Sequence, residues 1–364
     1  MRTEYASEVY TRLAHEALSL WREPLYSAAY HETGWIFCTD GTTELGRVQA
    51  FDQSVENTKK FGDASNMIEM EDWDDTLAKF PFLDYDKSQS SNIDKRSFRA
   101  VFNRNAGFIS GDRGTIVNLI RDNEGRVTGV EAKDGTKYTA GRVILAMGAY
   151  SDTLLDYESQ LEATAYVVSH VKLTEEQYQK YKNMPVINIF PPKEDRILKV
   201  CNTDTSYLNS ESSRERNGDW GSKSTPRDPA YHPTDTQPTH GKDVTQWFLK
   251  NFLPELASGQ LHSSRLCWDA EAHDYSWIIG THPSSPDSLY IATGGSGHSF
   301  KNFVNVGKYV VQMMDGKLDE KLRDLWRWRP DRVGVDLASE ERPRRPKIEL
   351  KGAEGWNHDE EKET

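Results

Sequence analysis

The chain has 364 residues, a length that suits two domains or one large domain. Its net charge of −12 disfavours nucleic acid or an anionic membrane surface as the main partner. No apolar run approaches the roughly 18 residues needed to span a bilayer, and the start of the chain has no signal-peptide pattern. The cysteines Cys38, Cys201 and Cys267 have no metal-ligand spacing, so no metal is expected. We expect a soluble, monomeric, cytoplasmic protein, because the C-terminus also lacks a peroxisomal Ser-Lys-Leu signal.

The first half of the chain contains a helix and then a group of strands. Apolar residues at helical spacing predict a helix over residues 3–22, which ends before Pro24. Residues 115–139 predict a three-stranded meander, in which Asp134 and Gly135 form a two-residue hairpin turn. Residues 143–146 are short and wholly apolar, which is typical of a strand buried on both faces of a parallel sheet.

The second half alternates between sheet and polar segments. Residues 161–200 alternate apolar and polar positions, which predicts a half-buried antiparallel sheet. Residues 202–243 are polar and predict a long surface loop, and residues 245–256 predict a helix. Residues 331–364 are charged and punctuated by proline, so we expect a tail that is poorly ordered or extended over the surface.

A glycine-rich turn follows an apolar strand at residues 289–292. Gly294, Gly295 and Gly297 allow the backbone to approach a ligand where a side chain would clash. A helix that begins after them would direct free N–H groups and the positive end of its dipole at that ligand. Such a site suits a phosphate, a carboxylate or the carbonyl edge of a cofactor ring. A tight strand-to-helix turn without any ligand explains the same pattern equally well.

Two well-known motifs fail at this turn. The dinucleotide motif G-x-G-x-x-G is absent, since Phe300 stands where the third glycine is required. The nucleophile elbow G-x-S-x-G also fails, because His298 replaces its last glycine. A serine hydrolase that uses Ser296 is therefore only a remote alternative.

Two further residues are candidates for chemistry. Cys267 is an isolated cysteine, and such a residue is most often a small buried hydrophobe. Lys199 lies within an apolar strand, and alternation places it on the same face as Ile197 and Cys201. That arrangement slightly favours an inward-facing lysine.

Several stretches taken together resemble one family of flavoenzymes, the FAD-dependent amine oxidases that include monomeric sarcosine oxidase and the fungal fructosyl amino acid oxidases (amadoriases). The resemblance covers residues 1–330 in the family's order, and the opening helix matches the fungal branch. The matching stretches are residues 102–107, 143–153, 197–201, 265–270, 292–301 and 326–330.

The resemblance implies a fold and a domain organisation. The fold is α/β, with a glutathione-reductase-like FAD-binding domain that lacks its first βαβ unit, beside an α+β substrate domain built on an antiparallel sheet. The FAD-binding domain would comprise residues 1–30, 104–160 and 268–330, the substrate domain residues 31–103 and 161–267, and the C-terminal tail residues 331–364.

The resemblance also implies an activity and its residues. The enzyme would oxidise secondary amines or N-substituted amino acids by hydride transfer to flavin N5, and reoxidation by O2 would give an imine and H2O2. Cys267 matches the cysteine that bonds covalently to the flavin, Lys199 the lysine that activates dioxygen, and Lys301 a lysine that helps to bind the substrate carboxylate. The remaining expected cofactor contacts are Gly148, Gly294, Gly295, Gly297, His298 and Phe300.

Three departures from the family pattern qualify these expectations. The βαβ unit with G-x-G-x-x-G is missing, and residues 105–107 are nearly fused to residues 110–115. We therefore expect a chain that begins just after that unit and binds FAD poorly, with a catalytically inactive truncated remnant as the alternative. Asn202 and Thr203 replace the Asp-Glu pair whose glutamate grips a sugar, so a glycated amino acid is not the favoured substrate. Sarcosine, pipecolate, saccharopine and N-methylated aromatic amino acids stay open.

Overall fold

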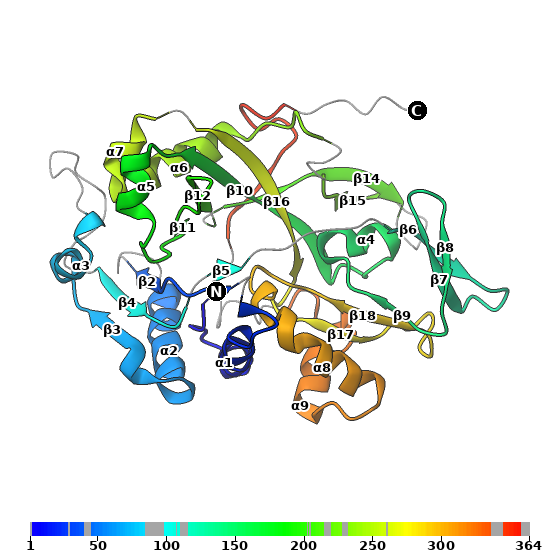
Figure 1. Ribbon diagram of the computed structural model, residues 1–364. Helices are drawn as coiled ribbons and strands as arrows, with labels where there is room; N and C mark the ends of the chain where they lie inside the picture. The colour runs from blue at the N-terminus through cyan, green and yellow to red at the C-terminus, as the bar shows by residue number, and fades with distance from the viewer. Residues whose placement is uncertain are drawn as a thin grey trace.

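The computed structural model in Figure 1 has one six-stranded sheet and several smaller sheets, with helices packed around them. It describes residues 2–27, 30–39, 45–83, 98–106, 108–109, 116–201, 203, 205–214, 220–227, 232–259, 261–335 and 345–357. Within these residues, no helix is long and apolar enough to cross a membrane. A cytoplasmic location stays a prediction.

The helices are α1 Glu8–Trp21, α2 Leu45–Phe61, α3 Trp73–Lys79, α4 Ser151–Leu154, α5 Glu175–Tyr181, α6 Thr239–Phe252, α7 Pro254–Ala257, α8 Phe303–Met314 and α9 Glu320–Trp326. The strands of the first half are β1 Tyr30–His31, β2 Trp35–Thr39, β3 Met67–Met70, β4 Arg99–Asn103, β5 Phe108–Ile109, β6 Ile116–Arg121, β7 Val127–Ala132, β8 Lys137–Thr139 and β9 Val143–Leu145. Those of the second half are β10 Leu161–Lys172, β11 Ile189–Phe190, β12 Ile197–Cys201, β13 Ser206–Leu208, β14 Ser210–Arg214, β15 Trp220–Ser224, β16 Ser263–Ala272, β17 Ile278–Thr281, β18 Leu289–Thr293 and β19 Lys347–Glu349.

The largest sheet has six strands and is organised around the long strand β10. Its order is β11-β12-β10-β13-β19, and β16 pairs with β10 in addition. The β10–β16 pairing is antiparallel and runs without interruption from Leu161, opposite Ala272, to His170, opposite Ser263. The antiparallel sheet that alternation predicts over residues 161–200 is thus confirmed.

One face of this sheet is apolar and packs on α6. Leu198 and Val200 of β12 are fully buried, in one cluster with Leu249 and Phe252 of α6. Burial of this face fixes the register, because a slip by one residue would turn the opposite set of side chains into the core.

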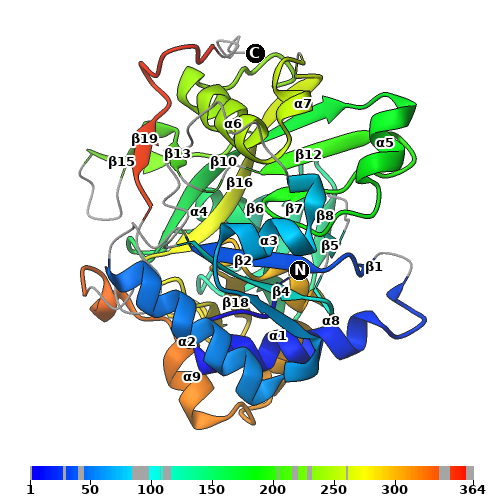
Figure 2. The same cartoon turned by 90° about the vertical axis from the view of Figure 1, so that its left-hand side faces the viewer.

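The C-terminal segment joins the fold in a way that the sequence did not indicate. Strand β19 pairs in parallel with β13, and Figure 2 shows the two strands side by side. Leu350, just after β19, is fully buried, and Trp356 lies in the same cluster. The expectation of a disordered or surface-extended tail is therefore wrong for this part of residues 331–364. The expected surface loop over residues 202–243 is also wrong where β13, β14 and β15 form.

A smaller sheet joins β17, β18 and β9, as the lower right of Figure 1 shows. Strand β9 runs parallel to β18, so the predicted parallel strand is confirmed, although Ile144 at its centre is 45% exposed. Helices α1 and α8 share an apolar cluster with β17. The cluster includes Leu13 of α1, Val310 of α8 and Ile279 of β17. The predicted meander is confirmed as the separate sheet of β6, β7 and β8.

The finer features of the expected fold stay predictions. They include the division into two domains and the absence of a first βαβ unit. The junction between residues 105–107 and 110–115 lies largely outside the described residues, as does Asn202.

Candidate functional site

Alternation along β10, β12 and β16 gathers reactive and charged side chains on the sheet face opposite the apolar one. Residues that are paired across neighbouring strands share a face. Tyr166 is paired with Cys267, and Val168 is paired with both Arg265 and Cys201. We call this surface the polar face; its members are Glu162, Thr164, Tyr166, Val168, His170, Lys172, Ile197, Lys199, Cys201, Ser263, Arg265, Cys267, Asp269 and Glu271.

Lys199 lies on the polar face, as alternation predicts. It is half-buried and is paired with His170 of β10. Its Nζ lies 4.9 Å from the centroid of the Phe190 ring, and it forms no ion pair with any described residue. A half-buried ammonium without a carboxylate partner has its charge available to a ligand or to a reacting group.

Two free cysteines flank β10 on the same face. Cys267 and Cys201 are each half-buried. Burial raises the pKa of the Cys201 thiol to about 11, although the charge of Lys199 opposes this shift. Cys201 is therefore a neutral thiol near neutral pH. Cys267 lies centrally on the polar face, opposite Tyr166.

The C-terminal segment contributes a cation that the sequence analysis missed. Arg345 donates a hydrogen bond from Nη1 to the Tyr166 hydroxyl at 2.7 Å, and that hydroxyl donates to Glu271 Oε2 at 3.0 Å. The Nζ atom of Lys347 lies 3.6 Å from Glu271 Oε1. A charged, proline-rich sequence is typical of a tail, and the weak signal for a strand is that Ile348 and Leu350 are two residues apart, the spacing of side chains on one face of a strand.

The glycine turn after β18 is docked on the end of β16. Gly294 and Gly297 have positive φ values of 79° and 72°, which favour glycine. A Cβ on Gly294 would lie 3.2 Å from the carbonyl oxygen of Ser276. The amide of Ser296 donates to the carbonyl of Ala270 at 2.8 Å. These glycines allow close packing of backbone on backbone.

Ser296 is part of this packing. Its hydroxyl accepts from the amide of Ala272 at 3.1 Å and donates to the carbonyl of Gly294 at 3.0 Å, and the residue is fully buried. A nucleophilic serine must be reached by its substrate. The alternative of a serine hydrolase therefore has no support in this geometry.

The residues after the turn pack toward the N-terminal segment. The Nε2 atom of His298 lies 2.9 Å from the carbonyl oxygen of Tyr275, and its ring meets Tyr10 edge-on. Lys301 is buried, donates to the carbonyl of His298, and lies 4.6 Å from the centroid of the Tyr5 ring. Phe300, by contrast, is 57% exposed. The cofactor and substrate roles of His298, Phe300 and Lys301 stay predictions.

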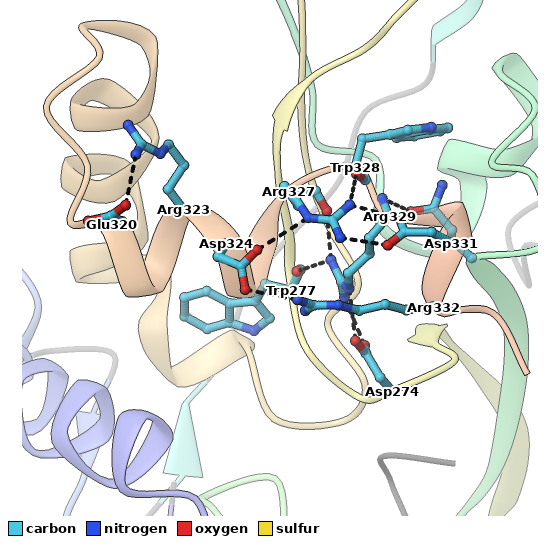
Figure 3. Close-up of polar contacts among 11 residues, drawn as sticks. Asp274, Trp277, Glu320, Arg323, Asp324, Arg327, Trp328, Arg329, Asp331 and Arg332 are labelled. Atoms are coloured by element: carbon cyan, nitrogen blue, oxygen red, sulfur yellow. Dashed lines mark hydrogen bonds and ion pairs between the residues drawn. The ribbon is translucent and has the colours of Figure 1, made fainter. Parts of the chain in front are cut away.

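Arg329 clamps the turn between β16 and β17, as Figure 3 shows. Its Nε and Nη2 donate to the two carboxylate oxygens of Asp274, each at 2.8 Å. Further bonds reach the carbonyls of Ser276, Trp277 and Arg327 at 2.9, 3.0 and 3.0 Å, so all five N–H groups are used. Since Gly294 packs against the carbonyl group of Ser276, which accepts a hydrogen bond from Arg329, these contacts also support the glycine turn.

The sequence matches one family of flavoproteins. Residues 2–313 match the model of the FAD dependent oxidoreductase family, DAO, and the chain belongs to that family. The prediction of an FAD-dependent oxidoreductase is thereby confirmed.

Particular relatives are also similar to this chain. It is 31% identical to L-saccharopine oxidase of Schizosaccharomyces pombe, over 97% of this chain and 87% of that protein. A fructosyl peptide oxidase from Aspergillus nidulans has a TM-score of 0.81 at 29% identity, over 97% of this chain and 86% of that structure. Amadoriase II from Aspergillus fumigatus has a TM-score of 0.74 at 24% identity, over 98% of this chain and 85% of that structure, and this likeness shows the shared fold.

The residues present fit the ring end of FAD. The polar face offers a half-buried thiol at Cys267 and an ammonium at Lys199. Gly148, in the turn after β9, has a φ of 57°, and an added Cβ would meet no atom within 4 Å. Gly148 therefore borders open space, whereas a Cβ on Gly295 would lie 3.1 Å from Asp269 Oδ1.

Proposed function

We propose that this chain is an FAD-dependent oxidase of secondary amines carried by N-substituted amino acids. The observation that carries the proposal is the pair of Lys199 and Cys267 on one sheet face, each half-buried and on opposite sides of β10. Membership of the FAD dependent oxidoreductase family supplies the cofactor. The names of its relatives, an L-saccharopine oxidase and an amino acid oxidase, support an amino-acid substrate.

Bound FAD would supply the redox chemistry, accepting a hydride from the carbon beside nitrogen and passing two electrons to O2, so that an imine and H2O2 result. Lys199 acts on the oxygen half of this reaction. Its ammonium stabilises the negative charge that develops on dioxygen, and the effect is strong because the site is partly shielded from water. Cys267 would hold the cofactor through a thioether: the thiol S–H bond and one C–H bond of a flavin ring methyl group break, a C–S bond forms, and the two electrons released reduce the flavin, which O2 would then reoxidise to give H2O2.

The role of Lys199 is tested by separating the two half-reactions. We expect Lys199→Met to slow reoxidation of the reduced, FAD-loaded enzyme by O2 by about 10²- to 10³-fold, the loss seen when one stabilising charge or donor is removed. Reduction by amine in the absence of O2 should change far less. Stopped-flow absorbance measures both rates.

Lys172→Met is the matched control. Lys172 lies on β10 of the same sheet, but it is exposed and donates to the carbonyl of Asp195 at 2.6 Å. An unchanged reoxidation rate in Lys199→Met, or an equal loss in the control, would contradict the role of Lys199.

Covalent attachment has its own test. After denaturation and gel filtration, the wild-type chain should retain flavin fluorescence, and Cys267→Ala should lose it. Cys201→Ala is the control, because Cys201 lies on the same face across β10. Flavin that leaves the denatured wild-type chain would exclude the thioether while leaving the oxidase proposal intact.

The rival functions have weaker support. The comparisons give no support to an inactive remnant, and the Ser296 hydroxyl is fully buried. A glycated substrate stays disfavoured on the sequence grounds given above.

A further inference from the structure

Arg265 is a cation of the polar face to which the proposed reaction assigns no role. It lies two residues before Cys267 on β16, so the two side chains project from the same face, roughly 7 Å apart along the strand. Arg265 is exposed, and it forms no hydrogen bond or ion pair with the described part of the chain. Its five N–H donors are therefore open to a ligand.

Charges at one end of the polar face are balanced. Glu162 pairs with Lys347, which also lies 3.6 Å from Glu271. Glu271 accepts from Tyr166, and Tyr166 accepts from Arg345. Two carboxylates thus meet two cations, and Asp269, paired with Thr164, adds a third carboxyl group, so this end offers no excess positive charge to an anionic substrate.

The other end of the polar face is positive. Lys199 and Arg265 flank β10 there, and no described carboxylate pairs with either. His170 lies between them and bonds through Nδ1 to the Ser263 hydroxyl at 3.0 Å. Burial lowers the pKa of His170, and the charges of Arg265 and Lys199 lower it further, so its imidazole is neutral near neutral pH. Two positive charges with no counter-charge attract an anion.

We propose that Arg265 binds a carboxylate of the substrate that is remote from the reacting nitrogen. The substrate class is then a secondary amine with a carboxylate on both of its substituents, rather than an N-alkyl amino acid. This inference rests on the proposed amine oxidation and specifies its substrate. A guanidinium suits the task because it grips a carboxylate through two parallel N–H bonds. Lys199 adds to the positive electrostatic potential at this end of the polar face, while its ammonium acts on dioxygen as proposed above.

The test compares two matched series of amines on the FAD-loaded enzyme. One series is N-(ω-carboxyalkyl)glycines and the other is N-alkylglycines of the same chain length. We expect kcat/KM to be higher for the carboxylated series. Arg265→Gln should lower kcat/KM for that series by about 10- to 100-fold, the range expected for a hydrogen bond to a charged group, mainly through KM. The N-alkylglycines should change less than about threefold, and Arg265→Lys should restore part of the loss.

Lys317→Gln is the control for a general loss of positive charge. Lys317 is 76% exposed and follows α8, away from the polar face. It should leave both series unchanged.

A second readout needs no turnover. Thioether analogues, in which sulfur replaces the amine nitrogen, cannot undergo this oxidation. By calorimetry, thiodiglycolate, with two carboxylates, should bind the wild type more tightly than (methylthio)acetate, with one, and Arg265→Gln should abolish the difference. Equal binding of the two thioethers by the wild type, or an unchanged preference in Arg265→Gln, would overturn the inference.

If N-alkylglycines are oxidised as well as their carboxylated partners, the inference fails and the oxidase proposal stands. If no amine reduces the flavin, the oxidase proposal fails, and the thioether binding alone decides whether Arg265 is a carboxylate site.

Discussion

Removal of the Arg329 side chain should destabilise the protein severely. Its guanidinium is fully buried, and the Asp274 side chain beneath it is 3% exposed. Arg329→Ala would leave that carboxylate buried without its cation and would remove the donors of three carbonyl groups. Breaking a buried ion pair from one side costs about 3–5 kcal/mol. We expect a loss of that size in the free energy of unfolding.

The same pair gives a pH dependence with a defined sign. Burial would raise the pKa of Asp274, but the hydrogen bonds and charge of Arg329 outweigh it and hold that pKa below its usual value. A lowered folded-state pKa stabilises the protein above the unfolded-state value of about 3.9, and this contribution is lost as the pH falls toward the folded-state pKa. The stability gap between the wild type and Arg329→Ala should therefore narrow as the pH falls below about 4.

Urea unfolding followed by tryptophan fluorescence measures both effects. Arg332→Ala is the matched control, since Arg332 is a neighbour in Figure 3 that pairs at 2.8 Å with Asp324, itself 63% exposed. An exposed pair of this kind contributes less than about 1 kcal/mol. The double variant Arg329→Ala with Asp274→Ala should lose less than the sum of the single losses, because no unpaired charge remains. Equal losses in Arg329→Ala and Arg332→Ala would refute the reasoning.

Two further predictions concern the glycine turn and the second cysteine. Gly294→Ala should lower the free energy of unfolding by about 1–3 kcal/mol, because φ is positive there and the new Cβ would lie 3.2 Å from the Ser276 carbonyl oxygen. Gly307→Ala in α8 should raise it by about 0.5–1 kcal/mol, because a Cβ there meets nothing within 4 Å. Thermal unfolding of both variants checks this, and similar melting shifts would count against it. Iodoacetamide at pH 8.5 should label Cys201 about 100-fold more slowly in the folded than in the denatured chain, because its pKa is raised to about 11. Mass spectrometry gives the rates, and equal labelling would contradict a raised pKa of the Cys201 thiol.

Local pattern predicted the elements whose signal is local. Residues 289–292 and 143–146 are apolar runs that end at glycine, and both form the expected strands, β18 and β9. Even there, the exposure of Ile144 could not be foreseen, because exposure depends on which strands lie alongside.

Features that depend on distant pairing were missed. Arg345 reaches the polar face because β19 pairs with β13, whose residues lie about 140 positions earlier in the chain. No local pattern encodes that contact. Residues 326–330 match the family's sequence, but the match does not say what Arg329 does. Its five hydrogen bonds in the structure show that this arginine holds the turn between β16 and β17.

Candidate side chains were partly predictable. Alternation placed Lys199 and Cys201 on one face, and the register of β12 with β10 agrees. Lys301 was expected at the substrate, and that role stays a prediction; its ammonium donates to the carbonyl of His298 beside Tyr5. A lysine's direction depends on its neighbours in space, and here these come from the opposite end of the chain.

The central claim is that this chain, loaded with FAD, oxidises a secondary amine at a site bordered by Lys199 and Cys267. Anaerobic titration of the loaded protein with a panel of N-substituted amino acids tests it most directly, with flavin absorbance as the signal. We expect at least one secondary amine to bleach the flavin, and the admission of O2 to restore the colour with one H2O2 for each flavin. Bleaching by primary amines or hydroxy acids alone, with no response to any secondary amine, would contradict it.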